Sequence, residues 1–268
     1  MSGWDADDDG GTRGPRRAQA QVRYGLVAPL VAGAPLWVDL GCGLGADAHP
    51  ALAGGAPRRA VLIDNVAGAA DEARAALGLP AATTTCVTAD LETDEGLRAV
   101  RDAAGELSDG AVITCFDTLG ALGSFVGVVD LLADAAQRGA TVVLSVPDHQ
   151  YVALEDPLGR GPSPRTMWGP GAVAELRRLL PEPQTTLRQV ALAGSAIVPE
   201  AVDAGVALAP VEIPAALPGV HLVLAAGPRA PELAPQAAVV PADADADRRH
   251  DVQAAADLAV LRIWSGRG

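Results

Sequence analysis

Lysine is absent from the 268 residues, and all twenty basic residues are arginine. Without a lysine amine the chain cannot form the Schiff base that pyridoxal phosphate enzymes and lysine-dependent aldolases require. Acidic residues number 33, which gives a formal net charge of −13 at pH 7. Because nucleic-acid binding requires a basic surface, this charge argues against a nucleic-acid partner.

Cysteines and long apolar runs are also scarce. The three cysteines, Cys42, Cys86 and Cys115, contain no C-x-x-C pair, so we expect structural thiols and neither disulfides nor a metal site. No apolar run approaches the ~20 residues that span a bilayer. Residues 1–14 are polar and lack the features of a signal peptide. We therefore expect a cytoplasmic protein with a disordered N-terminal tail and no membrane partner.

The stretch Leu-Trp-Val-Asp-Leu-Gly-Cys-Gly-Leu-Gly at residues 36–45 organises the rest of the chain. An apolar run ends there in three glycines at alternate positions, Gly41, Gly43 and Gly45. This pattern predicts a buried parallel strand that turns sharply into a helix over residues 46–52. The glycines allow a tight bend and the close approach of a ligand. The helix would present its unpaired N–H groups and its positive dipole end to that ligand.

Two classes of ligand use such a turn. Gly41, Gly43 and Ala46 fit the dinucleotide pattern G-x-G-x-x-G/A, which favours NAD. Asp39, however, stands where dinucleotide-binding strands usually carry an apolar residue, and its carboxylate would repel a pyrophosphate. An acid followed by G-x-G-x-G resembles motif I of the class I S-adenosylmethionine-dependent methyltransferases. The resemblance implies that Asp39 and the turn, with Cys42 in it, hold the amino-acid end of S-adenosylmethionine.

Two further acids follow the second and third predicted strands. Asp64 ends the second strand, where an acid accepts the ribose hydroxyls in both nucleotide-binding schemes; Asn65 follows it. Asp90 and Leu91 resemble methyltransferase motif III, which implies that the carboxylate accepts the adenine amino group and the next backbone N–H meets the ring. Taken alone, Asp90 would be a helix N-cap. Acids at three successive strand ends favour the methyltransferase.

The fourth predicted strand, residues 111–117, corresponds in place to motif IV. The resemblance implies that Cys115 and Phe116 contact the cofactor. Asp117, which ends the strand, is a candidate catalytic residue that orients an acceptor amine or hydroxyl, or else caps the next helix. Many small-molecule members of the family continue with a Glu-His pair, whereas this chain continues with Thr118. The base that such a histidine supplies is therefore missing at this point.

The loop after the fifth predicted strand holds Asp148, His149 and Tyr151. In the family this edge faces the transferable methyl group, which makes His149 our first candidate general base, although loop histidines are commonly plain surface residues. Asp148 and Tyr151 are candidate substrate-binding residues. Trp168 is another, in the Pro- and Gly-rich segment 153–170, which is either a lid over the acceptor or a solvated loop.

A helix is predicted from residue 15 to residue 31, and Pro29 is expected to end or kink it early. Arg23 and Tyr24 lie on this helix. The resemblance implies that the helix covers the cofactor, so that either side chain touches the methionine carboxylate or the substrate. The alternative is a surface arginine beside a core tyrosine.

The order of elements predicts an α/β fold: a doubly wound, Rossmann-like, seven-stranded mixed sheet with an N-terminal and a C-terminal helix. Its last two strands, within residues 185–198 and 220–226, form the antiparallel pair that is typical of the methyltransferase sheet and absent from a plain dinucleotide-binding domain. We expect the domain to cover residues 15–227. A Pro/Ala linker, 228–242, and a helix in 243–268 follow; this helix docks on the domain or on a second subunit, which leaves a homodimer open.

The resemblance implies an S-adenosylmethionine-dependent methyltransferase that acts on an O or N atom of a small molecule, in natural-product or sugar tailoring. Methyl transfer is a direct displacement at a carbon that the sulfonium activates. The protein therefore has to align the acceptor and to remove or tolerate a proton. Two alternatives stay open: an NAD-dependent oxidoreductase, and a methyltransferase-fold protein that binds the cofactor for structure or for a rearrangement.

Overall fold

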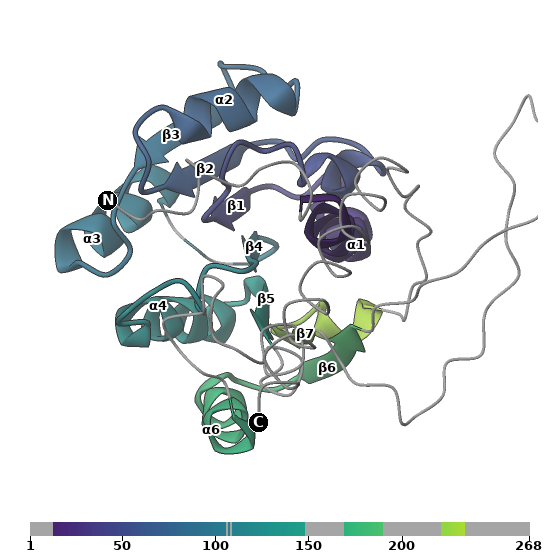
Figure 1. The fold of residues 1–268 in the computed structure, drawn as a ribbon, viewed down its shortest axis with the longest axis vertical. Helices are drawn as coiled ribbons and strands as arrows, with labels where there is room; N and C mark the ends of the chain where they lie inside the picture. Colours follow the sequence, from purple (N-terminus) through teal and green to yellow (C-terminus); the bar gives the residue numbers. More distant parts are fainter. Residues whose placement is uncertain (1–12, 106, 108, 148–168, 190–220, 234–268) are drawn as a thin grey trace, which may run out of the picture.

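The computed structural model describes residues 13–105, 107, 109–147, 169–189 and 221–233, with side chains from residue 19 onward. Its centre is a seven-stranded sheet in the order β3-β2-β1-β4-β5-β7-β6 (Figure 1). The first five strands in the chain are parallel, and β7 runs antiparallel to both of its neighbours. The strands are β1 (Trp37–Leu40), β2 (Ala60–Asp64), β3 (Thr84–Thr88), β4 (Val112–Cys115), β5 (Thr141–Pro147), β6 (Gln184–Gln189) and β7 (His221–Ala226).

Helices cover both faces of this sheet, which confirms the predicted doubly wound α/β architecture. One face carries α3, α4 and α6, and the other carries α1 and α2 (Figure 1). The helices are α1 (Arg13–Val31), α2 (Ala69–Ala76), α3 (Asp94–Ala104), α4 (Val126–Gln137) and α6 (Pro170–Leu179), with 3₁₀ turns η1 (His49–Leu52) and η2 (Ala230–Glu232). No helix in these described ranges is both long and apolar enough to cross a membrane.

The central strand β1 is buried on both faces, as its apolar sequence requires. Successive side chains of a strand point to opposite faces. Val38 and Leu40 therefore pack into the core beneath α3 and α4, while Trp37 packs into the core beneath α1. Asp39 shares the face of Trp37 and reaches α1 through a hydrogen bond to Tyr24. The alternation thus places a carboxylate between the sheet and the N-terminal helix.

The prediction of an α-helix over residues 46–52 is wrong. The N–H groups of Ala48, Ala51 and Ala53 each bond to the carbonyl three residues earlier, which is the pattern of 3₁₀ turns. Gly45 has a φ of 76°, and Pro50 has no N–H to donate, so an α-helical ladder cannot pass through this segment. No α-helix dipole therefore points at the glycine turn from these residues.

Of the two effects that we considered for Pro29, an early end of α1 or a kink, the early end is wrong, because the helix continues to Val31. Two of its last carbonyl groups are satisfied from outside the helix. The Arg229 guanidinium donates to Leu30 O at 2.9 Å and to Pro29 O at 3.0 Å. Arg229 thereby caps the C-terminus of α1 and fixes this helix end to the segment after β7.

Packed structure continues beyond residue 227, where we expected the domain to end. Residues 230–232 form η2, and Ala230 and Leu233 are buried against the core beneath α1. The start of the predicted Pro/Ala linker therefore belongs to the domain. The remainder of that linker, the predicted helix in 243–268 and the tail 1–12 lie outside the described residues.

Candidate functional site

The glycine turn after β1 places three glycines in the left-handed region: φ is 78° at Gly41, 53° at Gly43 and 76° at Gly45. A Cβ on Gly41 would lie 2.1 Å from Thr118 Oγ1, and one on Gly45 would lie 2.6 Å from Ala73 Cα. At Gly43 an added Cβ would meet nothing within 4 Å. Packing therefore requires glycine at the two outer positions, whereas the middle position faces open space that a ligand can approach.

Asp39 is fully buried beside this turn and accepts two hydrogen bonds from hydroxyl groups. The donors are Tyr24 OH at 2.9 Å and Thr114 Oγ1 at 2.6 Å. Burial raises the pKa of Asp39 to about 6, against the lowering effect of these two bonds. Within the described part of the chain, no basic side chain forms an ion pair with it. Among the described residues, this buried carboxylate therefore has hydroxyl partners but no cation.

Asp64 joins the end of β2 to the glycine turn. One carboxylate oxygen accepts the N–H of Gly43 at 2.9 Å, and the other accepts the N–H of Val66 at 2.9 Å. Leu44 and Val66, on the two segments that Asp64 joins, are exposed large apolar side chains. Asn65 beside them is exposed as well. Apolar surface around a hydrogen-bonding carboxylate suits a nucleoside, whose base is flat and whose ribose carries hydroxyls.

Asp90 lies just after β3 and is exposed. Its carboxylate accepts the N–H of Glu92 at 2.9 Å. The N-cap of α3 is Thr93, whose hydroxyl accepts the N–H of Gly96, so Asp90 is not the helix cap. The Leu91 side chain is buried in the core beneath α3, which leaves only the Leu91 backbone for the predicted contact with the adenine ring.

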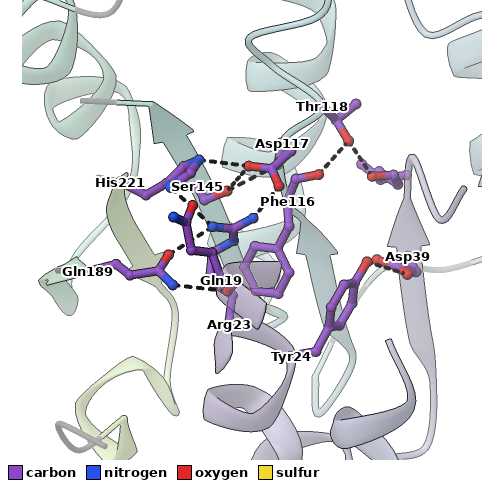
Figure 2. Close-up of polar contacts among 11 residues, drawn as sticks. Gln19, Arg23, Tyr24, Asp39, Phe116, Asp117, Thr118, Ser145, Gln189 and His221 are labelled. Atoms are coloured by element: carbon purple, nitrogen blue, oxygen red, sulfur yellow. Dashed lines mark hydrogen bonds and ion pairs between the residues drawn. The ribbon is translucent and has the colours of Figure 1, made fainter. Parts of the chain in front are cut away.

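Asp117 follows β4 and forms a polar cluster with Arg23 and His221 (Figure 2). Its Oδ2 pairs with the Arg23 guanidinium, and its Oδ1 lies 3.0 Å from His221 Nε2. The backbone N–H of Asp117 donates to Ser145 Oγ at 3.0 Å. The Asp117 side chain is 48% exposed, against 2% for Arg23 and 13% for His221. The Asp117 carboxylate is thus partly exposed to solvent, while its partners Arg23 and His221 are largely buried.

The backbone of Asp117 is left-handed, with a φ of 58°, and it is the one non-glycine residue of the described ranges with a positive φ. Such a conformation is unfavourable for a residue with a Cβ and is typical of functional sites. The hydrogen bond from its N–H to Ser145 and the ion pair of its side chain hold it in place. Asp117 therefore does not act as the helix cap that we considered, and the N-cap of α4 is Phe125.

The partners of His221 define which of its nitrogens carries the proton. Arg23 NH1 lies 3.1 Å from His221 Nδ1 and also donates to Gln189 Oε1 at 2.8 Å. A guanidinium only donates, so Nδ1 accepts; the Asp117 carboxylate only accepts, so Nε2 carries the hydrogen. Both ring nitrogens of His221 are engaged in this arrangement. It supports Asp117 and has no free nitrogen for a substrate proton.

Charge neighbours set the ionisation of Asp117. Burial alone would raise its pKa, but the Arg23 guanidinium, and after it the His221 ring, lower the pKa well below its ordinary value. The carboxylate is therefore ionised at neutral pH. A carboxylate with so low a pKa accepts hydrogen bonds but removes protons poorly.

Thr118 connects this cluster to the glycine turn. Its hydroxyl lies 2.8 Å from Leu40 O and 3.0 Å from Phe116 O. The Phe116 ring packs edge-on against Tyr24, with 5.0 Å between centroids, and Arg23 lies 6.0 Å from the same ring. The two carboxylate sites are thus joined through one loop after β4 and one helix, α1.

Several side chains that we expected at the cofactor are in the core. Cys115 is fully buried beneath α3 and α4, and Phe116 is buried beneath α1. Cys42 is buried too, and burial raises the pKa of its thiol far above the ordinary value. These residues can offer a ligand only backbone groups or ring edges. The alternative of a surface arginine beside a core tyrosine is wrong for Arg23, because its side chain is buried.

The structure brings part of the predicted site together. Tyr24 bonds to Asp39, and Asp64 bonds to Gly43 in the glycine turn. The predicted base and the predicted substrate contacts lie outside the described residues; these are His149, Asp148, Tyr151 and Trp168.

The sequence argument missed five residues with polar roles in the site: Thr114, Thr118, Ser145, Gln189 and His221. One signal was present for His221. It is the second residue of the last predicted strand, 220–226, and an antiparallel last strand starts at the edge where the parallel strands end. The pairing of His221 with Pro147, the last residue of β5, places it there.

No protein-family model matches the chain, and no curated protein matches its sequence. Solved structures do match its fold. The methyltransferase domain of bacterial CtHen1-C superposes with a TM-score of 0.53 at 16% identity, over 78% of this chain and 98% of that domain. The small RNA methyltransferase HEN1 superposes with a TM-score of 0.53 at 12% identity, over 84% of this chain but 26% of HEN1. The chain therefore has the class I S-adenosylmethionine-dependent methyltransferase fold; identities this low establish nothing finer.

Proposed function

We propose that the protein is an S-adenosylmethionine-dependent methyltransferase that acts on an O or N atom of a small molecule, in natural-product or sugar tailoring. Asp39 carries the proposal. It is a buried carboxylate at a glycine turn, with hydroxyl partners and a pKa raised to about 6. S-adenosylmethionine would bring an ammonium and a sulfonium to it, whereas a dinucleotide would bring a negatively charged pyrophosphate. The charge at the turn therefore favours the first ligand over NAD.

In our proposal the residues at this edge of the sheet hold the whole cofactor. Gly43 leaves open space at the turn, and the carboxylate of Asp64 would accept the ribose hydroxyls. Asp90 and the backbone N–H of Leu91 would meet the adenine ring. The exposed side chains of Leu44 and Val66 would lose contact with water when the nucleoside binds.

The bound cofactor supplies a methyl group on a positively charged sulfur. The chain has to align the acceptor with that methyl group and exclude competing water. In our proposal Asp117 orients the acceptor through a hydrogen bond, and its low pKa makes it a poor general base. His149 stays our candidate base. The net charge of −13 disfavours an RNA acceptor such as the one that the name of HEN1 states.

Calorimetric titration with S-adenosylmethionine, S-adenosylhomocysteine and NAD tests the proposal. We expect the two adenosyl ligands to bind with dissociation constants on the order of micromolar and NAD to give no heat of binding. Binding of NAD alone would overturn the proposal and favour the oxidoreductase. Tight adenosyl binding without methyl transfer to any acceptor would favour the alternative in which the cofactor has a structural or rearrangement role.

A further inference from the structure

We propose that Thr114 is a positioning residue for the cofactor: together with Trp37 it holds the Asp39 carboxylate in place for the positively charged amino-acid end of S-adenosylmethionine. The inference rests on the proposed function and deepens it, because it names the residues that keep this buried carboxylate oriented. Thr114 and Trp37 act on the cofactor only through Asp39.

The first observation is that the three side chains lie on one face of two central strands. Trp37 and Asp39 are two residues apart on β1, so they point to the same side of the sheet. Asp39 pairs in register with Thr114 of the parallel neighbour β4. All three side chains are fully buried. The positions of the three groups are therefore set by two paired strands and not by a loop.

The second observation is the direction of the hydrogen bonds. Trp37 Nε1 lies 2.9 Å from Thr114 Oγ1, and because an indole N–H only donates, the Thr114 oxygen accepts this bond. The single hydroxyl hydrogen of Thr114 has two acceptors in reach, Asp39 Oδ1 at 2.6 Å and Val38 O at 3.3 Å. The carboxylate is the nearer acceptor, and when it is ionised its charge makes it the stronger one. Trp37 thus helps to turn the Thr114 hydrogen toward Asp39.

The third observation is that the two oxygens of Asp39 have donors on different elements. Thr114 of β4 donates to Oδ1, whereas Tyr24 of α1 donates to Oδ2 at 2.9 Å, a bond that Figure 2 shows. The Tyr24 bond depends on how α1 packs on the sheet, while the Thr114 bond is set by the register of β1 and β4. Groups fixed on rigid elements in this way hold a binding geometry before the ligand arrives. The donor on the strand therefore fixes the orientation of the carboxylate.

The titratable groups that interact with Asp39 supply no cation within the described ranges. They are Tyr24 of α1, Cys42 of the glycine turn, Asp64 of β2 and Cys115 of β4. Burial raises the pKa of Asp39 to about 6, and the Thr114 bond opposes that rise. Loss of the Thr114 hydroxyl should therefore move the protonation of Asp39 to higher pH, which gives the positioning role a readout of its own.

The test compares three ligands by calorimetry: S-adenosylmethionine, S-adenosylhomocysteine and methylthioadenosine. The first two carry the ammonium group, whereas the third has the same nucleoside but no amino-acid end. Thr114→Val removes the hydroxyl at nearly constant size, and we expect it to weaken the first two ligands about tenfold and methylthioadenosine by less than about twofold. Thr114→Ser keeps the hydroxyl and should bind all three within about threefold of the native protein.

Thr141→Val is the matched control. Thr141 is a buried threonine on β5, and its hydroxyl accepts the N–H of Arg229 at 3.2 Å. This variant also loses a buried hydroxyl from the sheet, but away from Asp39, so all three affinities should stay at their native values. A loss in Thr141→Val as large as that in Thr114→Val would overturn the inference, because any buried threonine of the sheet would then have the same effect.

The outcomes separate the inference from the proposed function. If the native protein binds none of the three ligands, the proposed function fails and the inference falls with it. If the native protein binds them and Thr114→Val keeps its affinity for S-adenosylmethionine, the inference alone is overturned. Equal losses for S-adenosylhomocysteine and methylthioadenosine would also overturn it, because Thr114 would then support only the fold.

The pH profile is the second readout. The affinity for S-adenosylmethionine should fall as Asp39 takes up a proton, and the pH of this fall should be higher in Thr114→Val than in the native protein and in Thr114→Ser. The same pH in all three proteins would contradict the positioning role.

The Trp37 indole N–H gives a third readout that needs no change at Thr114. The chain contains four tryptophans, so their indole signals can be resolved and assigned by NMR. A cation at Asp39 alters the hydrogen bond from Thr114 and, through it, the bond from Trp37. We expect the Trp37 signal to shift more with S-adenosylhomocysteine than with methylthioadenosine. A shift with methylthioadenosine of equal or larger size would overturn the inference even if Thr114→Val failed to fold.

Discussion

The surroundings of two carboxylates in this protein, Asp39 and Asp117, shift their pKa values in opposite directions. Asp39 is fully buried, has hydroxyl donors, and has a pKa raised to about 6. Asp117 is half exposed, pairs with Arg23, and has a pKa well below its ordinary value. The first charge lacks a cation within the described residues, whereas the second has one built into the fold. In our proposal Asp39 receives the cationic end of the cofactor and Asp117 orients the methyl acceptor.

The two sites also differ in how the chain assembles them. The hydrogen bonds of the first site span 15 positions from Tyr24 to Asp39, 21 from Gly43 to Asp64 and 75 from Thr114 to Asp39. Arg23 in the second site reaches Asp117 over 94 positions, Gln189 over 166 and His221 over 198. The second site therefore exists only when α1, β6 and β7 are all packed on the sheet, and it depends more strongly on the tertiary fold.

The largest expected effect is at the first site, in Asp64→Ala. The change removes the proposed ribose acceptor and frees the N–H groups of Gly43 and Val66, so we expect S-adenosylmethionine to bind about 100-fold more weakly. Calorimetry measures the loss. Asp71→Ala, at an exposed acid on α2, is the control and should bind normally. Unchanged affinity in folded Asp64→Ala would remove the ribose role.

Asp39→Asn should change folding stability and cofactor binding in opposite directions. The pKa of Asp39 in the folded state, about 6, exceeds its ordinary value, so the folded state binds more protons and loses stability as pH rises from about 4 to about 6. Removing the buried charge should therefore raise the free energy of unfolding at neutral pH by about 3 kcal/mol while weakening the binding of S-adenosylmethionine. Urea unfolding at several pH values checks this. A variant that is less stable than the native protein at pH 7 would contradict it.

A double-mutant cycle measures how strongly the ion pair of the second site, Arg23 with Asp117, stabilises the fold. We expect Arg23→Met and Asp117→Asn to show a coupling energy of about 1–2 kcal/mol in urea unfolding, because Arg23 is buried. The pair Arg138–Asp134 on α4 has both side chains about half exposed and should couple by less than about 0.5 kcal/mol. Equal coupling in the two pairs would mean that the Arg23 cluster contributes no more than a surface ion pair.

The smallest expected effect is in Tyr24→Phe. The change keeps the ring on Phe116 but removes one of the two hydroxyl donors to Asp39. We expect a loss of about 1 kcal/mol in the free energy of unfolding, or about 2–4 °C in Tm for a domain of this size. A calorimetric scan measures it. No loss at neutral pH would mean that Asp39 finds another donor, or that the carboxyl group is already protonated there.

The first site was predictable because its residues follow from local rules. An apolar run before glycines located Asp39, and the same rule at the next strands located Asp64 and Asp90. The sheet order followed from the alternation of strands and helices. The alternation of side chains along a strand and the glycine pattern cannot predict the contact of Arg23 with Asp117. That contact depends on how α1 packs across the sheet. The 3₁₀ turns at η1 were missed because alanine-rich composition suggests a helix even where Gly45 and Pro50 prevent one.

The most direct test of the account is the number of protons released when S-adenosylmethionine binds. Calorimetric titration in buffers of different ionisation enthalpy gives this number. A cation that reaches Asp39 lowers its pKa from about 6, so the native protein should release protons near pH 6. Asp39→Asn, measured in the same buffers, should lose that release. Equal proton release in the native protein and in the variant would contradict the assignment of Asp39 as the receptor for the cationic cofactor.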